Sequence, residues 1–302
     1  MKLGIIDLGS NTIRLVIYNW KGNKLEKLLN IKRKAQSIKY IHNDQMDQDG
    51  INVIIETLKE LLMIARIHDT EEISIFATAS LRNITNSNEA KSMIEYAIKF
   101  PIEILSGMDE SLLGFEGIKR SSKLPLEGIS VDIGGGSTEI TYYKNEQVIN
   151  AISIPIGSLS LYGAHVGDVL PTESEHKQIR RHIQEKLSMI EWLDSLHIDR
   201  VIGIGGSVRA ILRLHQSQNN LKQSIFELSV SSVDIHDLIE QSIKDPLMIS
   251  KRIFDSVPDR LTTVIPGGLI LDEIMSLVHA KELRGSSAGL REGYLYERML
   301  ER

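Results

Sequence analysis

The chain has 302 residues, a formal net charge of −5, 42% hydrophobic residues and no cysteine. This length suffices for two domains with buried cores, and the lack of cysteine excludes disulfides, thiolate catalysis and cysteine-ligated zinc. The acidic balance argues against a general nucleic-acid binder. The apolar start, residues 3–6, is too short for a signal peptide, and no run reaches the roughly 20 apolar residues of a membrane helix. We therefore expect a cytoplasmic protein without nucleic-acid or membrane partners.

The first part of the chain predicts strands around a tight turn, followed by alternating helices and strands. Apolar alternation and helical spacing give strands at 3–6, 13–18 and 25–31, a helix at 51–67, a buried strand at 73–77, a helix at 88–99, a short strand at 102–105 and a helix from about 107 to 121. The segment 121–128 has the character of a link between two lobes.

The second part opens with a strand that runs into Asp132 and then three glycines. It continues with a strand at 147–154, a helix at 173–194, a strand at 201–204, a loop at 215–224, helices at 232–244, 247–255 and 266–280, a strand at 283–286 and a terminal helix at 291–300.

The two openings repeat each other with a constant shift of 125 residues. Residues 7–15 fall on residues 132–140, so that Asp7 meets Asp132 and Gly9 meets Gly134. A strand precedes and follows each turn. The repeat predicts a duplicated unit, whose two turns would hold a phosphate chain between them.

The turns have the composition of anion-binding loops. Glycines let successive N–H groups point at one anion, and Asp132 and Glu139 are hard oxygen ligands suited to Mg²⁺. A second Gly-rich junction, residues 203–209, would present a helix N-terminus to an anion. A lone run of three glycines is equally typical of an ordinary turn, and no Walker A or Rossmann pattern is present.

Six motifs occur in order: 7–15 (DLGSNTIRL), 77–82 (ATASLR), 104–110 (ILSGMDE), 132–139 (DIGGGSTE), 203–207 (GIGGS) and 289–293 (GLREG). Together they resemble the exopolyphosphatase / guanosine pentaphosphate phosphohydrolase family, in its short two-domain form, within the acetate kinase–sugar kinase–actin superfamily. The resemblance runs from residue 3 to about 300.

The resemblance implies an α/β, duplicated actin-like ATPase (ribonuclease H-like) fold, with two lobes of mixed sheets and a central cleft. We expect lobe I at 1–122 and lobe II at 123–290, with the C-terminal helix, 291–302, packing back onto lobe I. It further implies a cytoplasmic homodimer.

By the same resemblance, Glu110 is the base for the attacking water, and Asp132 and Glu139, with Asp7, hold Mg²⁺ or Mn²⁺. The phosphate-binding residues implied are Gly9, Ser10, Asn11, Arg14, Arg82, Gly135, Gly136, Ser137, Thr138, Gly206 and Ser207. Phosphoryl transfer needs an aligned water, a cation and fixed donors, which this set supplies.

The implied reaction is release of terminal orthophosphate from inorganic polyphosphate. The alternative is 5′-phosphohydrolysis of guanosine pentaphosphate (pppGpp), with the tetraphosphate as a related ligand. A third hypothesis is a catalytically weak nucleotide- or phosphate-sensing protein, because the family's Glu-Glu-Ala-Arg reads Asp109-Glu110-Ser111-Leu112 here and lacks the arginine. A sugar kinase or filament ATPase is disfavoured by the motifs at 104–110 and 289–293.

Overall fold

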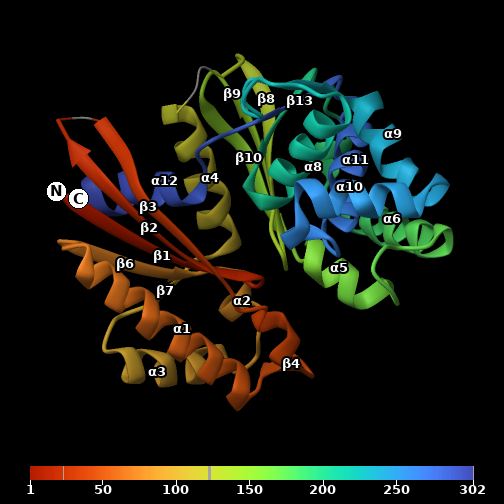
Figure 1. Ribbon diagram of the computed structural model, residues 1–302. Coiled ribbons are helices and arrows are strands. Elements are labelled where there is room, and N and C mark those ends of the chain that lie inside the picture. The colour runs from red at the N-terminus through yellow and green to blue at the C-terminus, as the bar shows by residue number, and fades with distance from the viewer. Residues whose placement is uncertain (23, 122–123, 302) are drawn as a thin grey trace. The chain divides into compact units, whose positions relative to one another are not determined.

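The computed structural model describes residues 1–22, 24–121 and 124–301. Its contacts divide the chain into two compact units, Met1–Asp109 and Glu110–Arg302, each described here by itself. The lobe boundary that the sequence predicts, between residues 122 and 123, lies outside the described residues. Each unit consists of a mixed sheet and helices (Figure 1), which confirms the predicted α/β class.

The first unit is built on a sheet with the strand order β3-β2-β1-β6-β7. Its elements are β1 (Lys2–Leu8), β2 (Thr12–Lys21), β3 (Lys24–Lys34), the small hairpin β4 (Ile41–His42) and β5 (Gln45–Met46), α1 (Gln48–Ile67), β6 (Glu72–Ala77), α2 (Ala79–Arg82), α3 (Ser87–Ile98) and β7 (Glu103–Ile104). Helices α1 and α3 cover one face of this sheet, where the apolar stripe of α1 packs on Ile6 and Leu15.

The second unit has a sheet with the order β10-β9-β8-β11-β13-β12. Its elements are α4 (Gly107–Ser121, from Glu110 onward), β8 (Glu127–Ile133), β9 (Thr138–Lys144), β10 (Gln147–Ile154), α5 (Ser158–His165), α6 (Glu173–Leu187), α7 (Glu191–Asp194), β11 (Arg200–Ile204), α8 (Gly205–Gln218), β12 (Ser229–Ser231), α9 (Ser232–Lys244), α10 (Pro246–Ser256), α11 (Val264–Leu277), β13 (Glu282–Gly285), α12 (Leu290–Tyr294) and a π-helical turn (Leu295–Leu300).

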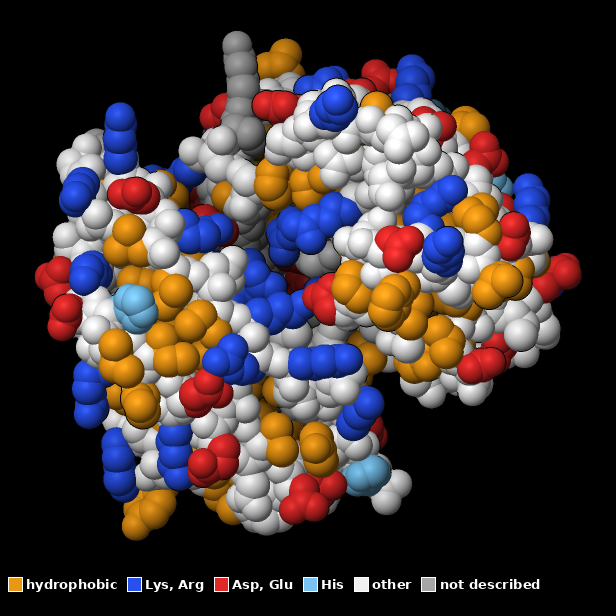
Figure 2. All heavy atoms as spheres, in the orientation of Figure 1, with side chains coloured by type: hydrophobic (Ala, Val, Ile, Leu, Met, Phe, Trp, Pro, Cys, Tyr) orange, Lys and Arg blue, Asp and Glu red, His pale blue; other side chains and the backbone are white. Residues whose placement is uncertain are grey.

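The surface mixes charges of both signs with scattered apolar side chains on the face that Figure 2 shows. Within the described residues, no helix is long and apolar enough to cross a membrane.

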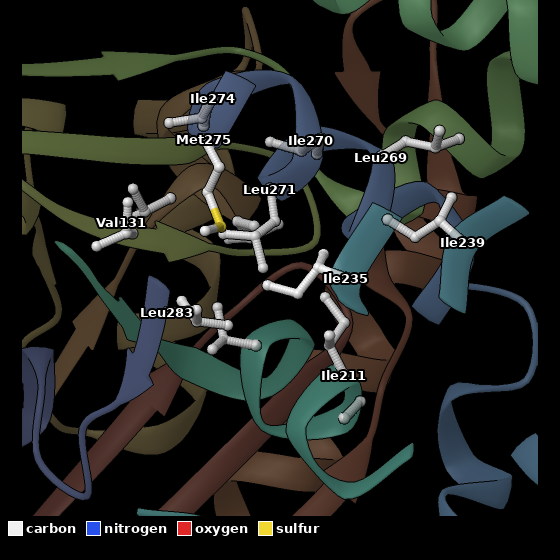
Figure 3. Close-up of a cluster of buried hydrophobic side chains, with 14 of the residues drawn as sticks. Val131, Ile211, Ile235, Ile239, Leu269, Ile270, Leu271, Ile274, Met275 and Leu283 are labelled. Atoms are coloured by element: carbon white, nitrogen blue, oxygen red, sulfur yellow. The ribbon is translucent and has the colours of Figure 1, made fainter. Parts of the chain in front are cut away.

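Two layers cover the second sheet. On one face, aliphatic side chains from β8, α8, α9, α11 and β13 form the larger core, part of which Figure 3 shows. On the other face, Phe115 and Ile118 of α4 pack on Tyr143, Ile202 and Ile204. The C-terminal segment lies on α4 in turn, because a Cβ at Gly293 would overlap the carbonyl of Leu113.

Several elements differ from the sequence prediction, and for three of them the local sequence or contacts give the reason. The helix predicted at 173–194 is two helices, α6 and α7, since α6 ends at Leu187 and the hydroxyl of Ser188 donates to the carbonyl of Glu185 (3.0 Å). The predicted loop at 215–224 begins late, because α8 continues to Gln218. Helix α5 was not predicted, as its mixture of serine and apolar residues has no clear helical period.

The duplication predicted from the sequence is visible in the strand order. In each unit a hairpin pair (β1–β2, β8–β9) continues antiparallel to a third strand, and its first strand pairs in parallel with the fourth. Each turn closes with the same bond, from the amide of Gly9 to the carbonyl of Thr12 (3.2 Å) and from Gly134 to Ser137 (2.9 Å).

A β-bulge is also repeated. One extra residue interrupts the β2–β3 pairing, at Leu28, and one interrupts the β9–β10 pairing, at Ile149. Because a one-residue shift turns side chains to the opposite face, these bulges decide which residues lie beside the turns.

Candidate active site

In the second unit, three residues in register form a row across the sheet. Asp132 on β8 lies opposite Glu139 on β9, which lies opposite Ser153 on β10. The row is on the face that α4 covers, because Asp132 also pairs with Ile204, one of the residues that pack on α4.

Glu139 is the most unusual group of this row. Only 3% of its surface is exposed. Burial, and then the nearby carboxylates of Glu110 and Asp132, raise the pKa of Glu139 well above its usual range, while hydroxyls of Ser153 and Ser137 act in the opposite direction. The Ser153 hydroxyl donates to its Oε1 at 2.6 Å. Glu139 is thus buried near two other carboxylates.

Helix α4 brings Glu110 to this cluster. The helix begins after Ser106, whose hydroxyl accepts from the Asp109 amide (3.0 Å) and donates to the Asp109 carboxylate (2.6 Å). Asp109 thus caps the helix. The hydroxyl of Ser111 reaches the carbonyl of Ile152 on β10 (3.3 Å), so the residues around Glu110 are attached to the sheet.

The Gly134–Ser137 turn is oriented by α5. The amide and hydroxyl of Ser158 donate to the Gly134 carbonyl (2.9 and 3.0 Å), and the amides of Leu159 and Ser160 donate to the Gly135 carbonyl (both 2.9 Å). In a trans peptide the N–H points opposite to the C=O. The amides of Gly135 and Gly136 therefore point away from α5, and neither has a hydrogen bond within the described chain.

The second Gly-rich junction adjoins the same cluster. Gly205 has a φ of +82°, and a Cβ there would overlap Asp132 Oδ1, so only glycine fits. A Cβ at Gly206 would overlap the guanidinium of Arg260. Burial lowers the pKa of Arg260, while the charge of Asp259 acts in the opposite direction. A guanidinium thus lies against the Gly205–Gly206 junction, whose first glycine is in contact with Asp132.

Two hydroxyls that the sequence predicts to bind phosphate donate hydrogen bonds within the second unit. Thr138 is fully buried and donates to the Ile156 carbonyl (2.7 Å). Ser207 is 1% exposed and donates to the hydroxyl of Ser158 (3.3 Å). These two side chains support the loops.

The first unit holds the other predicted residues. A second row crosses its sheet, from Asp7 to Arg14 to Lys32. The Ser10 and Asn11 carbonyls accept from the segment after β3, which turns the Asn11 amide away from that segment. The Gly9 amide donates to the Thr12 carbonyl within the turn. Asn11 Oδ1 is buried and has no hydrogen-bond partner within the described residues.

The two predicted arginines of the first unit are anchored by neutral groups. Arg14 Nη1 donates to Asn30 Oδ1 (3.2 Å), and Arg82 Nη1 donates to the Leu105 carbonyl (3.3 Å). These hydrogen bonds orient both side chains.

The sequence motifs do not indicate Arg260 or Ser153. Arg260 lies 54 residues after Gly206 and belongs to no Gly-rich motif, so no local pattern indicates it. Ser153 lies opposite Glu139 only because of the Ile149 bulge; regular pairing would place Ile152 there.

Known proteins resemble the chain over nearly its whole length. It is 23% identical to a protein of Haemophilus influenzae that carries the provisional name exopolyphosphatase, covering 98% of this chain and 90% of that protein. It is 25% identical to guanosine-5′-triphosphate,3′-diphosphate pyrophosphatase of Aeromonas hydrophila, covering 96% of this chain but only 58% of that relative.

Solved structures show the same fold. An exopolyphosphatase of Cytophaga hutchinsonii matches with a TM-score of 0.87 at 20% identity, over 98% of this chain and 97% of the other. A Ppx/GppA family member of Aquifex aeolicus matches with a TM-score of 0.81 at 25% identity, over 100% and 98%. The predicted duplicated actin-like fold is confirmed. The model of the Ppx/GppA phosphatase family matches residues 16–302, and the chain belongs to this family of phosphoanhydride hydrolases.

Proposed function

We propose that the chain releases terminal orthophosphate from inorganic polyphosphate. The proposal rests on one observation: groups suited to bind a cation and groups suited to bind an anion belong to the same unit. The carboxylates of Glu110, Asp132 and Glu139 belong to the same unit as two outward-pointing amides and the guanidinium of Arg260. Carboxylates would repel a phosphate unless a cation accompanied it, so the arrangement suits a phosphate bound together with a divalent metal.

The donor set fits Mg²⁺ or Mn²⁺ bound partly by substrate. Within the described chain, no three His, Asp or Glu side chains converge as ligands of one metal ion. Mg²⁺ is usually held by one or two carboxylates, with waters and substrate phosphates completing its shell. Asp132 and Glu139 would supply these carboxylates, and Asp7 of the first unit remains a predicted contributor. The bound cation would neutralise charge on the phosphate oxygens.

The protein's own residues then have distinct roles. Glu110, at the start of the capped helix α4, accepts a proton from the attacking water. The water oxygen bonds to the terminal phosphorus while the bond from that phosphorus to the bridging oxygen breaks. Amides of Gly135 and Gly136, with Arg260, bind phosphate oxygens. Arg14, Arg82 and the Asn11 amide of the first unit remain predicted phosphate donors.

The alternative substrate is pppGpp, favoured by the named activity of the Aeromonas hydrophila relative. Polyphosphate is favoured by the name of the Haemophilus influenzae relative, exopolyphosphatase. The absence of the family's arginine at Leu112 leaves the sensing hypothesis as the third candidate.

One assay separates the three. Phosphate release is measured side by side from polyphosphate and from pppGpp, with Mg²⁺ and with a chelator, for the native chain and for Glu110→Gln. We expect release from polyphosphate at the higher kcat/KM, dependent on metal and on Glu110. A higher value for pppGpp would favour the nucleotide activity, and release from neither would favour sensing.

A further inference from the structure

Helix α5 holds the Gly134–Ser137 turn through donors of two kinds. Three of the four bonds come from backbone amides, and the fourth comes from the hydroxyl of Ser158, which donates to the Gly134 carbonyl (3.0 Å). The same carbonyl accepts from the Ser158 amide (2.9 Å). Every residue except proline keeps its backbone amide when it is substituted. A substitution at Ser158 can therefore remove the hydroxyl bond alone.

The hydroxyl acts on one particular peptide of the turn. The Gly134 carbonyl and the Gly135 amide belong to the same planar unit and point in opposite directions. Two donors from Ser158 thus fix the direction of the Gly135 amide. The turn and α5 approach closely here, because a Cβ at Gly157 would overlap the Gly135 carbonyl. Without the hydroxyl, this peptide would keep a single bond to α5, and the direction of its amide would be less constrained.

Ser158 also links the turn to the second Gly-rich junction. Its hydroxyl gives its proton to Gly134, so it accepts the bond from the Ser207 hydroxyl of α8 (3.3 Å). Both serines are buried, at 0% and 1% exposure. A Cβ at Gly267 of α11 would lie 3.0 Å from the Ser207 Cβ and 3.3 Å from the Ser158 Cβ, so three helices meet at small residues. Because a buried hydroxyl without a partner costs free energy, these bonds hold both side chains in place.

We propose that Ser158 is a positioning residue for phosphate. Its hydroxyl directs the Gly135 amide at the ligand and links this peptide to Ser207 of the second Gly-rich junction. The inference rests on the proposed function, in which the Gly135 amide binds a phosphate oxygen. The competing interpretation is that the hydroxyl only stabilises the packing of α5. That role would lower the stability of the fold and leave the affinity for phosphate unchanged.

The test compares Ser158→Ala with Ser160→Ala, a matched control on the same helix. The Ser160 hydroxyl donates to the Gly157 carbonyl (3.1 Å) and accepts from the Gly157 amide (2.9 Å), so it caps α5 and leaves the turn to the Ser160 amide. The readouts are the affinity for inorganic phosphate with Mg²⁺, followed by the NMR shift of the Gly135 amide, and KM and kcat for tripolyphosphate. Thermal unfolding of each variant reports the structural effect separately.

We expect Ser158→Ala to weaken phosphate binding about two- to tenfold, the usual worth of one neutral hydrogen bond. KM for tripolyphosphate should rise by a similar factor, with a smaller change in kcat. Ser160→Ala should leave phosphate affinity and KM unchanged. Native phosphate affinity in Ser158→Ala, an equal loss in Ser160→Ala, or a Gly135 amide that does not respond to phosphate in the native chain would overturn the proposal.

A further variant keeps the test decisive if Ser158→Ala does not fold. Ser207→Ala removes only the bond into Ser158, so we expect a smaller loss of phosphate affinity, and native affinity would then overturn the proposal.

The phosphate titration also separates this inference from the proposed function. If the native chain hydrolyses neither polyphosphate nor pppGpp, the proposed function fails, while a Gly135 amide whose phosphate response is weakened by Ser158→Ala would still support the role of Ser158. If hydrolysis proceeds and Ser158→Ala binds phosphate like the native chain, only the role of Ser158 fails.

Discussion

The two turns share their backbone hydrogen bond, but the side chains on the strands beside them differ in charge. In the first unit the row across the sheet reads Asp7, Arg14, Lys32; in the second it reads Asp132, Glu139, Ser153. The turn bond, the strand order and even the one-residue bulge are repeated. Beside an aspartate that both copies share, the first copy thus carries an arginine and a lysine where the second carries a glutamate and a serine.

The largest expected effect concerns Glu110, whose carboxylate lies near those of Asp132 and Glu139 in the second unit. Glu110→Gln removes the proton acceptor and should lower kcat for phosphate release by about 10²- to 10⁴-fold, the usual contribution of a general base. Asp109→Asn is the control, since Asp109 caps α4. Stopped assays of both variants check this; an equal loss in the control would remove the special role of Glu110.

The second prediction concerns the helix layers, where only the second unit buries a histidine among the described residues. His176 is 2% exposed, its Nε2 is hydrogen-bonded to the Ser242 hydroxyl (2.9 Å) and its Nδ1 has no partner within the described residues. Burial lowers the pKa of His176 from 6.5 to about 4. The unfolded chain therefore binds a proton below about pH 6.5 that the folded chain accepts only near pH 4.

Folding stability should consequently fall as the pH drops from about 6.5 to about 4, and stay level above that window. The histidine accounts for up to about 3 kcal/mol of this loss. The His176→Gln variant, whose side chain can still form a hydrogen bond with Ser242, should not show this pH-dependent loss of stability. Urea unfolding of both proteins between pH 7 and 4 gives the difference, and parallel stability curves would contradict the assignment.

The third prediction tests whether the acidic row lowers stability. Because burial and two carboxylates raise the pKa of Glu139, its ionised form is disfavoured in the folded state. Glu139→Gln should raise the free energy of unfolding at pH 8 without divalent metal by about 1–3 kcal/mol, while weakening activity. Mg²⁺ should stabilise the native chain more than the variant. A variant less stable than the native chain would show that the charge is well compensated.

The smallest expected effect concerns the outer end of the row. Ser153→Ala removes the hydroxyl that orients Glu139, and groups that orient metal ligands commonly contribute about tenfold in metal affinity or activity. We expect the Mg²⁺ concentration for half-maximal activity to rise about tenfold, with Ser153→Thr restoring most of it. A change in kcat alone, at unchanged Mg²⁺ dependence, would argue against a positioning role.

Much of this scaffold could be predicted from the sequence because its signals are local. The repeated Asp-x-Gly turns predicted both hairpins, and the Ser106–Asp109 cap marks the start of α4. What connects distant segments could not be predicted. The bulges at Leu28 and Ile149 have no composition signal, yet they decide that Lys32 and Ser153 complete the rows. Arg260 reaches Gly206 only through tertiary packing.

The attachment of α5 to the Gly134–Ser137 turn has a thermodynamic consequence. Glycine loses more conformational entropy on ordering than any other residue, and a mobile glycine loop would oppose ligand binding by that amount. Here four donors from Ser158, Leu159 and Ser160 order the turn when the unit folds. If the turn binds phosphate as proposed, the site is preorganised, and more of the interaction energy would appear as affinity.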